Sequence, residues 1–94
     1  MGSEKALERK LREAVKKAGG LAVKLTPVGL TGMPDRLILL PGGRVAFAEI
    51  KSAGKKPTAL QQTRIAALRV LGFTAAVIDG EERLKGFLEE LHVI

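Results

Sequence analysis

Two runs of strand-forming residues, joined by a three-residue turn, constrain the fold of this chain more than any other feature. The runs cover residues 36–40 and 44–51, and the turn is the Pro-Gly-Gly segment 41–43. Strand formers on both sides of a short glycine-containing segment are typical of an antiparallel hairpin. If the residues that flank the turn pair with each other, the same register continues to the open end of the hairpin and sets Asp35 opposite Glu49.

This register predicts an unusual pair of like charges. Side chains that lie directly opposite each other on two strands have Cβ atoms about 4.5–5.5 Å apart, and like charges at that distance repel. A divalent cation would make the pair favourable, because hard cations such as Mg²⁺ bind carboxylate oxygens. Side chains alternate along a strand, so Lys51 emerges on the same face as Glu49. The competing interpretations are a turn aspartate after Pro34 and a structural ion pair of Glu49 with Lys51 or Arg36.

The ordered set Pro34-Asp35, then Glu49-Ile50-Lys51, resembles the PD-(D/E)XK nuclease superfamily. Within it, the chain looks most like the virus-type replication-repair nuclease domain, VRR-NUC. The resemblance extends over nearly the whole chain, from a glutamate on an N-terminal helix to a Leu-Gln step at residues 60–61. It implies a restriction-endonuclease-like α/β fold, with a mixed central sheet flanked by helices in the order α-β-β-β-α-β-α.

The resemblance also implies roles for individual residues. A bound Mg²⁺ or Mn²⁺ ion would be held by Asp35, Glu49, the Ile50 carbonyl and Glu8. The resemblance makes Lys51 the residue that orients the attacking water, and it assigns Gln61 to the active site; as a surface residue Gln61 would need no explanation. Helical spacing alone leaves the first-helix acid open between Glu4 and Glu8, because both border the apolar stripe; the Glu-Arg step after Leu7 selects Glu8.

The charge of the chain favours a polyanionic partner. Its 94 residues carry 16 Lys and Arg against 10 Asp and Glu, a net charge of +6. Such a balance suits DNA, although it also describes a solubilising surface. Three Phe residues and no Tyr or Trp leave little for base stacking, so backbone-directed binding is expected. The candidate DNA-binding residues are Lys55, Lys56, Lys24 and Arg36. The chain has no Cys and one His, so any metal must be held by oxygen.

Periodicity and turn signals predict the remaining elements within one domain, 1–94. Helices are expected at residues 4–18, with Ser3 as N-cap, and from about residue 60 to Gly72, and strands at 21–26 and 73–78. A last helix is expected to begin with a capping box of Asp79 and Glu82. Its apolar stripe consists of Leu84, Phe87, Leu88 and Leu91.

The resulting hypothesis is a metal-dependent endonuclease that acts on structured or branched DNA, such as four-way junctions. A homodimer is expected, with the stripe of the last helix as the most favoured source of its interface. The alternatives are a DNA-binding or assembly module that keeps the fold without hydrolysis, and an acidic pair that is only a structural ion site. A cytoplasmic location, in a bacterium or an infected host cell, is expected because no run is long and apolar enough to span a bilayer.

Overall fold

The computed structural model describes residues 3–26 and 29–94 of the chain. Its elements, in order, are α1 (Glu4–Lys17), β1 (Leu21–Lys24), β2 (Arg36–Leu40), the 3₁₀ turn η1 (Pro41–Gly43), β3 (Arg44–Ile50), α2 (Ala59–Val70), β4 (Thr74–Ile78) and α3 (Glu81–Glu90). The order of helices and strands is the α-β-β-β-α-β-α expected from the sequence, so the predicted fold class is confirmed.

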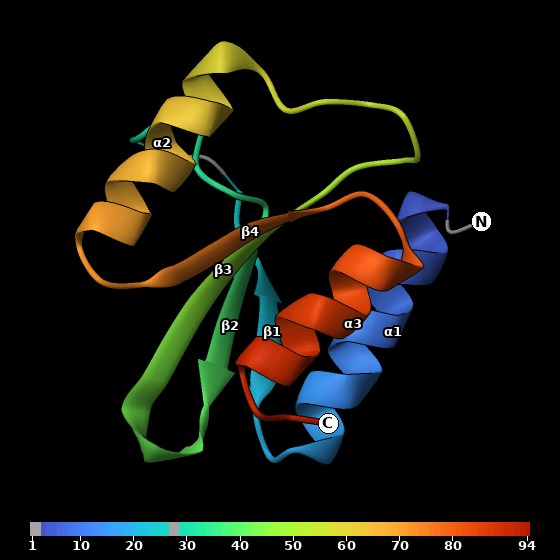
Figure 1. Ribbon diagram of the computed structural model, residues 1–94. Helices are drawn as coiled ribbons and strands as arrows, with labels where there is room; N and C mark the ends of the chain where they lie inside the picture. Colours follow the sequence, from blue (N-terminus) through green and yellow to red (C-terminus); the bar gives the residue numbers. More distant parts are fainter. Residues whose placement is uncertain (1–2, 27–28) are drawn as a thin grey trace.

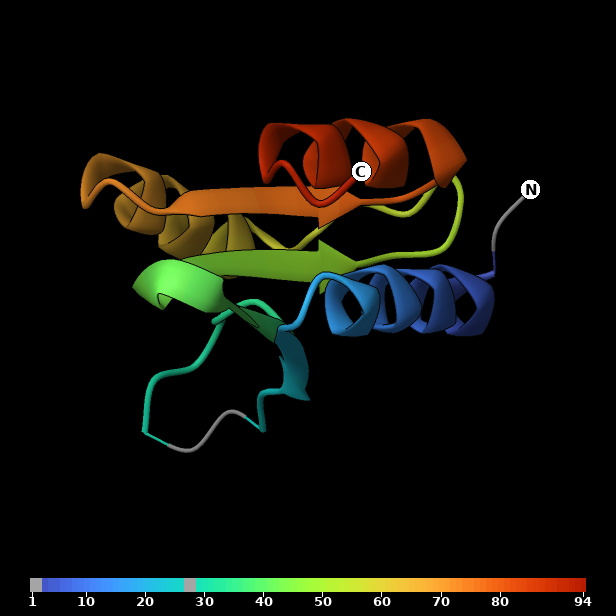
Figure 2. The ribbon, with the colours of Figure 1, turned by 90° about the horizontal axis from the view of Figure 1, so that it is seen from below.

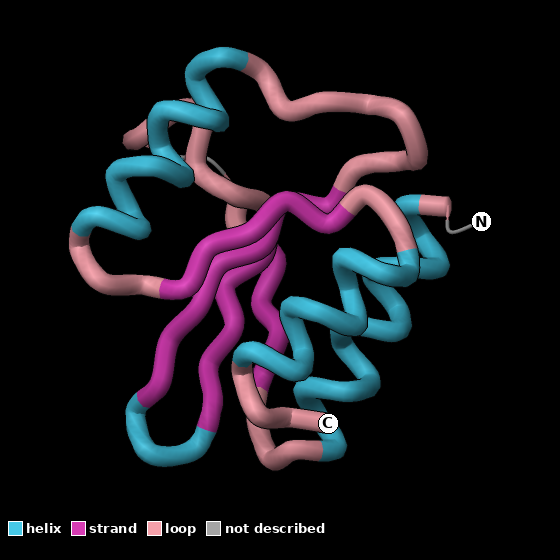
Figure 3. Tube along the Cα trace, in the orientation of Figure 1, coloured by secondary structure: helices cyan, strands magenta, loops and turns pink. Residues whose placement is uncertain are grey.

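The four strands form one mixed sheet in the order β1-β2-β3-β4. The three N-terminal strands pair antiparallel, whereas β4 lies parallel to β3 at the edge. Leu40 pairs with Arg44 across the turn, and Arg36 pairs with Ala48 near the other end of the hairpin. The predicted hairpin register is therefore confirmed. Figure 3 shows the β2–β3 hairpin as two neighbouring strands that leave the same turn.

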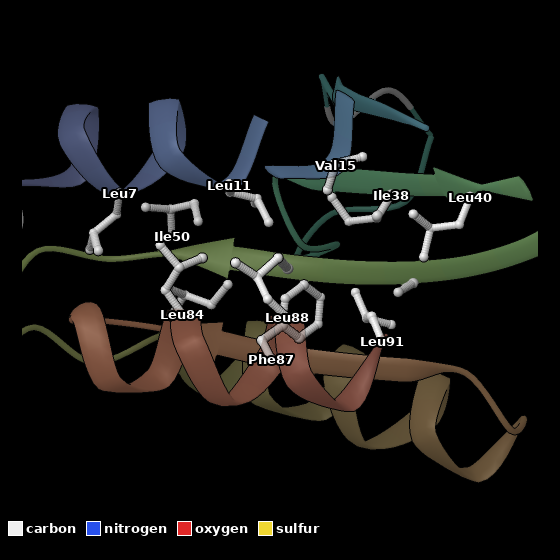
Figure 4. Packing of buried hydrophobic residues seen from close by; sticks show 13 residues of the cluster. Leu7, Leu11, Val15, Ile38, Leu40, Ile50, Leu84, Phe87, Leu88 and Leu91 are labelled. Carbon is white, nitrogen blue, oxygen red and sulfur yellow. The ribbon is translucent and has the colours of Figure 1, made fainter. Parts of the chain in front are cut away.

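The helices cover the two faces of the sheet unequally. Figure 1 shows α2 on one side of the sheet and α1 together with α3 on the other. Residues that alternate along β3, such as Ala46, Ala48 and Ile50, join the larger core beneath α1 and α3. Figure 4 shows this core filled by side chains from both helices and from the strands between them. Phe47 points to the opposite face and packs with Ile65 of α2.

The apolar stripe of α3 belongs to the larger core. Its four members are almost completely buried against the chain's own sheet and α1: Leu84, Phe87, Leu88 and Leu91. Burial of each such side chain contributes roughly 1.5–3 kcal/mol relative to exposure. The stripe is therefore occupied within the molecule, and the interface that the sequence assigned to it must lie elsewhere if a dimer forms.

The ends of the helices follow the local sequence in two of three cases. The Ser3 hydroxyl accepts a hydrogen bond from the Ala6 N–H, as predicted for the N-cap of α1. Thr58 caps α2 in the same way. The predicted capping box of α3 is wrong, because Gly80 occupies the N-cap position and supplies no side-chain acceptor. Glu81 and Glu82 lie in the first turn of α3 instead, where negative charge complements the helix dipole.

The hairpin turn requires glycine at both of its last positions. Gly42 and Gly43 have φ angles of 81° and 73°, in the left-handed region that side chains with a Cβ disfavour. Pro41 precedes them with the fixed φ that suits the start of a turn. None of the helices in the described part of the chain is both long and apolar enough to cross a membrane.

Candidate active site

The open end of the β2–β3 hairpin brings Asp35 and Glu49 together, as the register predicts. The Asp35 N–H donates a hydrogen bond of 3.1 Å to Glu49 Oε1. In return, Asp35 Oδ1 accepts a hydrogen bond of 3.1 Å from the Ile50 N–H. These two bonds replace the next rung of the strand ladder. The acidic pair is therefore built into the end of the sheet, and it does not depend on a flexible loop.

The Ile50 carbonyl shares this position. The N–H and C=O groups of one strand residue point to the same neighbouring strand. Because the Ile50 N–H points to Asp35, its carbonyl lies on the Asp35 side of β3. Lys51 points its own N–H to the other side, where it donates to the Ile78 carbonyl of β4. The Ile50 carbonyl is thus on the side of β3 where Asp35 lies.

Glu49 is the buried charged residue of the described chain, with 4% of its surface exposed. Its Oε2 lies 3.3 Å from Lys51 Nζ and accepts a hydrogen bond of 3.3 Å from Gln61 Nε2. A buried carboxylate without such partners would cost several kcal/mol. The neighbours of Glu49 therefore hold both of its oxygens in place and keep Lys51 at the site.

Gln61 reaches the site because of the way α2 begins. The Gln61 N–H donates to the Thr58 hydroxyl, and Gln61 Oε1 accepts from the Thr58 N–H, which completes a capping box. With its oxygen held there, the amide turns its NH₂ group toward Glu49. Thr58 was not singled out from the sequence, although its T-x-x-Q spacing to Gln61 is the signal for this box.

Both carboxylates are held in an environment that resists ionisation. Burial raises the pKa of Asp35 above its ordinary value, opposed by the hydrogen bond from Ile50 and the charge of Arg36. Burial also raises the pKa of Glu49, and the negative charge of Asp35 raises it further, against the opposing effect of Lys51. The pair therefore carries an unfavourable electrostatic energy that a bound cation would relieve.

Glu8 lies on the α1 side of the site, half-buried. Its carboxylate is 3.0 Å from an Arg12 nitrogen and 3.6 Å from an Arg36 nitrogen. Glu8 and Glu4 line a hollow of about 190 Å³ with Asp35, Arg36 and Ile50. Within residues 3–26 and 29–94, no three His, Cys, Asp or Glu side chains lie close enough to share one metal ion. The structure thus places Glu8 beside the acidic pair, with its charge engaged by two arginines.

The candidate DNA-binding cations occupy different environments. Lys24, Lys55 and Lys56 are exposed, and Lys24 pairs with Arg36 across β1 and β2. The Arg36 side chain is only 12% exposed, and it donates to the Asp35 carbonyl besides pairing with Glu8. Figures 1 and 2 show the segment 51–58, which carries two of these lysines, and the start of α1 at the same end of the molecule. That end is the one to which β3 points.

The chemistry of the donors suits a hard divalent cation. Carboxylate and main-chain carbonyl oxygens are the ligands that Mg²⁺ and Mn²⁺ bind in proteins, and the charge of the ion would offset the repulsion within the pair. Asp35, Glu49 and the Ile50 carbonyl are the groups that would hold it. Lys51 adds a compact positive charge within reach of the same oxygens.

A mixed sheet of this order, with a Pro-Asp step, a Glu-x-Lys strand end and flanking helices, defines an α/β domain of the restriction-endonuclease-like class. The chain is similar over 92% of its length to a solved structure described as a VRR_NUC domain, with a TM-score of 0.83, 29% sequence identity and 94% of that chain covered.

It is also 40% identical over 79 residues to "Putative nuclease p44" of Acyrthosiphon pisum secondary endosymbiont phage 1, which covers 84% of this chain and 85% of the relative. No family model matches the sequence. With this fold and this relative, the chain belongs to the VRR-NUC domain family, as its motifs predict.

Proposed function

We propose that this protein is a metal-dependent endonuclease that hydrolyses phosphodiester bonds in DNA, with residues 1–94 acting as one nuclease domain. The observation that carries the proposal is the paired bonding of Asp35 and Glu49, with Lys51 against the same carboxylate. A chain that needed only a stable sheet end would not place two desolvated carboxylates opposite each other, because this arrangement opposes folding. The fold and the nuclease named among its relatives support the same activity.

In this proposal each residue has a defined task. Asp35 and Glu49 provide the carboxylates that bind the divalent ion, together with the Ile50 carbonyl. Lys51 orients the attacking water and neutralises charge on the scissile phosphate, because its Nζ lies at the carboxylate that would hold the ion. Gln61 positions Glu49 through its amide. Glu8 acts through a water molecule, since its own oxygens pair with Arg12 and Arg36.

The divalent ion, Mg²⁺ or Mn²⁺, supplies Lewis-acid activation of water and stabilises the charge that develops on the phosphate. The protein contributes the fixed position of the ligands. Glu49 is held at both oxygens, and Asp35 is fixed through the Ile50 N–H. Pre-arranged ligands of this kind lose little conformational entropy when the ion binds.

We further propose that the substrate is structured or branched DNA and that the protein acts as a homodimer. Two incisions across a four-way junction require two active sites related by a two-fold axis. The α3 stripe is buried, but apolar side chains remain exposed at the end of α2, with Val70 87% and Leu71 72% exposed. Beside them runs the free edge of β4, where the Ala75 carbonyl accepts from Arg69 Nε.

The charges on this β4 surface favour contact with a second copy of the chain. The hollow at the edge of β4 has a volume of about 490 Å³ and contains both Arg83 and Glu90, so a two-fold partner would meet opposite charges. Sedimentation at micromolar concentration tests the dimer. Two copies per particle are expected, and a Val70→Lys variant should reduce the association. A monomer that stays monomeric on junction DNA would contradict it.

A cleavage panel tests the catalytic proposal. Labelled single-stranded, duplex, flap and four-way DNA are incubated with the parent protein, with Mg²⁺, with Mn²⁺ or with a chelator. We expect incision of the branched substrates with either ion and none with the chelator. Asp35→Asn should lose activity by about 10³-fold or more, whereas Glu89→Gln, an exposed carboxylate on α3, should match the parent. Binding of the same DNA without any incision would favour the non-catalytic alternative.

We also place the activity in the cytoplasm of a bacterium or of a phage-infected cell. The support is a relative encoded by a phage of a bacterial endosymbiont. Fractionation of cells that produce the tagged protein from its native promoter tests this location, and recovery outside the cytoplasmic fraction would contradict it.

A further inference from the structure

One face of α1 carries three cations that the nuclease site does not use. Lys5, Arg9 and Arg12 follow each other at intervals of four and three residues, which places them on the same side of a helix. All three are exposed, with side-chain exposures of 59% for Arg9 and 56% for Arg12. Together they line a hollow of about 270 Å³, and we call these three residues the α1 basic face.

This hollow lies next to one that belongs to the active site. Lys5 and Glu8 line it and also line the hollow of about 190 Å³ that ends at Asp35 and Ile50. The two hollows therefore adjoin each other on the surface, with Lys5 and Glu8 between them. The α1 basic face is thus the approach to the acidic pair from the α1 side.

The charge changes sign along this path. The hollow at the α1 basic face contains three cationic side chains against one carboxylate, Glu8. The hollow at the acidic pair contains two cations, Lys5 and Arg36, against three carboxylates. A phosphate is favoured at the first and disfavoured at the second until a divalent ion is present. This gradient suits a DNA strand whose scissile phosphate lies over the ion while its neighbours contact the helix.

We infer that the α1 basic face binds the phosphate backbone of the DNA strand that enters the active site, an inference that rests on the proposed nuclease function. From Lys5 to Arg12 the helix rises about 10 Å at about 1.5 Å per residue. The phosphates of one strand rise about 3.4 Å each along the duplex axis and also wind around it, so a helix face of this length can contact two phosphates or more.

The ion pairs of the α1 basic face are weak enough to yield to phosphate. Arg9 is 3.9 Å from Glu13, and Arg12 is 3.0 Å from Glu8, with both arginines more than half exposed. Exposed pairs of this kind contribute about 0–1 kcal/mol. When Arg12 turns to a phosphate, Glu8 keeps its contact with Arg36. The intramolecular pairs thus hold the arginines in place without blocking their use.

Salt-dependent binding tests this inference. A 20-base-pair duplex and a four-way junction of several unrelated sequences are titrated with protein in a chelator, so that no cleavage takes place. The variants are Lys5→Gln/Arg9→Gln/Arg12→Gln, and the double variant without the Arg12 change, which keeps the Arg12–Glu8 pair. Backbone binding predicts that the slope of log K against log salt becomes shallower by about 1 for each contact removed, equally for all sequences.

A matched control removes the same charge elsewhere. Lys16→Gln/Lys17→Gln/Lys85→Gln lowers the net charge by the same amount at exposed positions on α1 and α3. Its slope should change much less than that of the triple variant of the α1 basic face. Equal slopes in the parent and both α1 basic-face variants, or equal loss in the control, would overturn the inference.

The outcome is separate from that of the nuclease proposal. If the parent protein cuts no DNA but the salt slope falls as expected, the α1 basic face still binds backbone and only the catalytic proposal fails. If the parent cuts DNA, the double variant Lys5→Gln/Arg9→Gln, which keeps the Arg12–Glu8 pair, should show a lower kcat/KM at 150 mM salt while kcat at saturating DNA stays within about twofold. A selective loss of kcat would contradict a role in backbone binding.

Discussion

The two ends of the β2–β3 hairpin share one register but have opposite physical characters. At the turn, Gly42 and Gly43 are exposed and have left-handed backbones, and a Cβ added to either would meet open space. At the open end, Asp35 and Glu49 are packed together, and burial raises the pKa of both. The unfavourable energy of the turn is conformational and local, whereas that of the open end is electrostatic. Only the second can be relieved by a ligand.

The two ends of the hairpin therefore have different tasks: the turn determines the strand register, and the open end carries the acidic pair. The turn fixes which residues pair, and the pairing then carries Asp35 to Glu49. A change at the turn should therefore affect stability without affecting chemistry. A change at the open end should affect chemistry strongly and should change stability through the charges of the pair. The following variants test this difference from the largest expected effect to the smallest.

Lys51→Ala should have the largest effect among these variants, a loss of catalysis, with some loss of stability because buried Glu49 loses its cationic partner. Loss of the positive charge 3.3 Å from Glu49 removes a contact to the developing charge on phosphate, so cleavage should fall by about 10³-fold, or about 4 kcal/mol. The melting response to Mg²⁺ should remain, because the ligands stay in place. Single-turnover cleavage rates measure the first effect. Activity equal to that of the parent would remove Lys51 from the mechanism.

Ile38→Ala should have the next largest effect, a loss of stability in the part of the hairpin between its two ends. Ile38 lies midway along β2, is completely buried and belongs to the larger core. Removing its side chain should lower the free energy of unfolding by about 3 kcal/mol, and Ile38→Val by about 1 kcal/mol. Urea denaturation measures both. Similar small losses in the two variants would show that this part of the core is loosely packed.

Gly42→Ala should destabilise the turn end by about 1–2 kcal/mol. Its φ of 81° is unfavourable for a residue with a Cβ, and the added carbon meets no neighbour, so the whole cost is conformational. Cleavage below the melting temperature should stay at the level of the parent. A loss of activity in the folded variant would mean that the turn and the acidic pair are more tightly coupled than the register alone implies.

Asp35→Asn should have a small effect of opposite sign on stability. The amide keeps an oxygen for the Ile50 N–H but removes one of two facing charges, so the metal-free protein should gain about 0.2–1 kcal/mol. Chemical denaturation in a chelator at pH 7 measures it. A loss of stability would mean that the Asp35 charge is favourable in the metal-free state, through Arg36 or Lys51.

The same pair should make stability depend on pH. Burial raises the pKa of Asp35 from an ordinary 3.8, and the pKa of Glu49 from an ordinary 4.5, so both bind protons more readily when folded. Their contribution is fully present below those ordinary values and is lost as pH rises through the raised ones. The stability gain of Asp35→Asn over the parent should therefore shrink on acidification below neutral pH. A difference that is constant with pH would contradict these shifts.

Sequence reasoning reached the fold and the acidic pair because both rest on short-range signals. The hairpin turn and alternation are enough to place Asp35 opposite Glu49 and Lys51 on the face of Glu49. The α3 N-cap was mispredicted because Gly80 begins the helix one residue after the better capping residue, Asp79. Local propensity does not decide that choice when packing of the following stripe sets where the helix starts.

The surroundings of the pair were harder to predict, because they depend on where helices dock. Helical spacing left Glu4 and Glu8 open, and only the docking of α1 shows Glu8 between two arginines. Gln61 reaches Glu49 through its bond to Thr58, which joins a local capping signal to a contact twelve residues away along the chain. Long-range contacts of this kind have no signature in a single sequence.

Thermal melting with and without divalent ions tests the central claim, that the hairpin register builds a metal-binding carboxylate pair. At ten times the Kd, an ion that binds only the folded state adds about 1.4 kcal/mol, or about 6–11 °C in Tm for a domain of this size. The parent protein and Glu89→Gln should show this rise with Mg²⁺ or Mn²⁺, and Asp35→Asn should not. A parent Tm that is unchanged up to 10 mM of either ion would contradict the account.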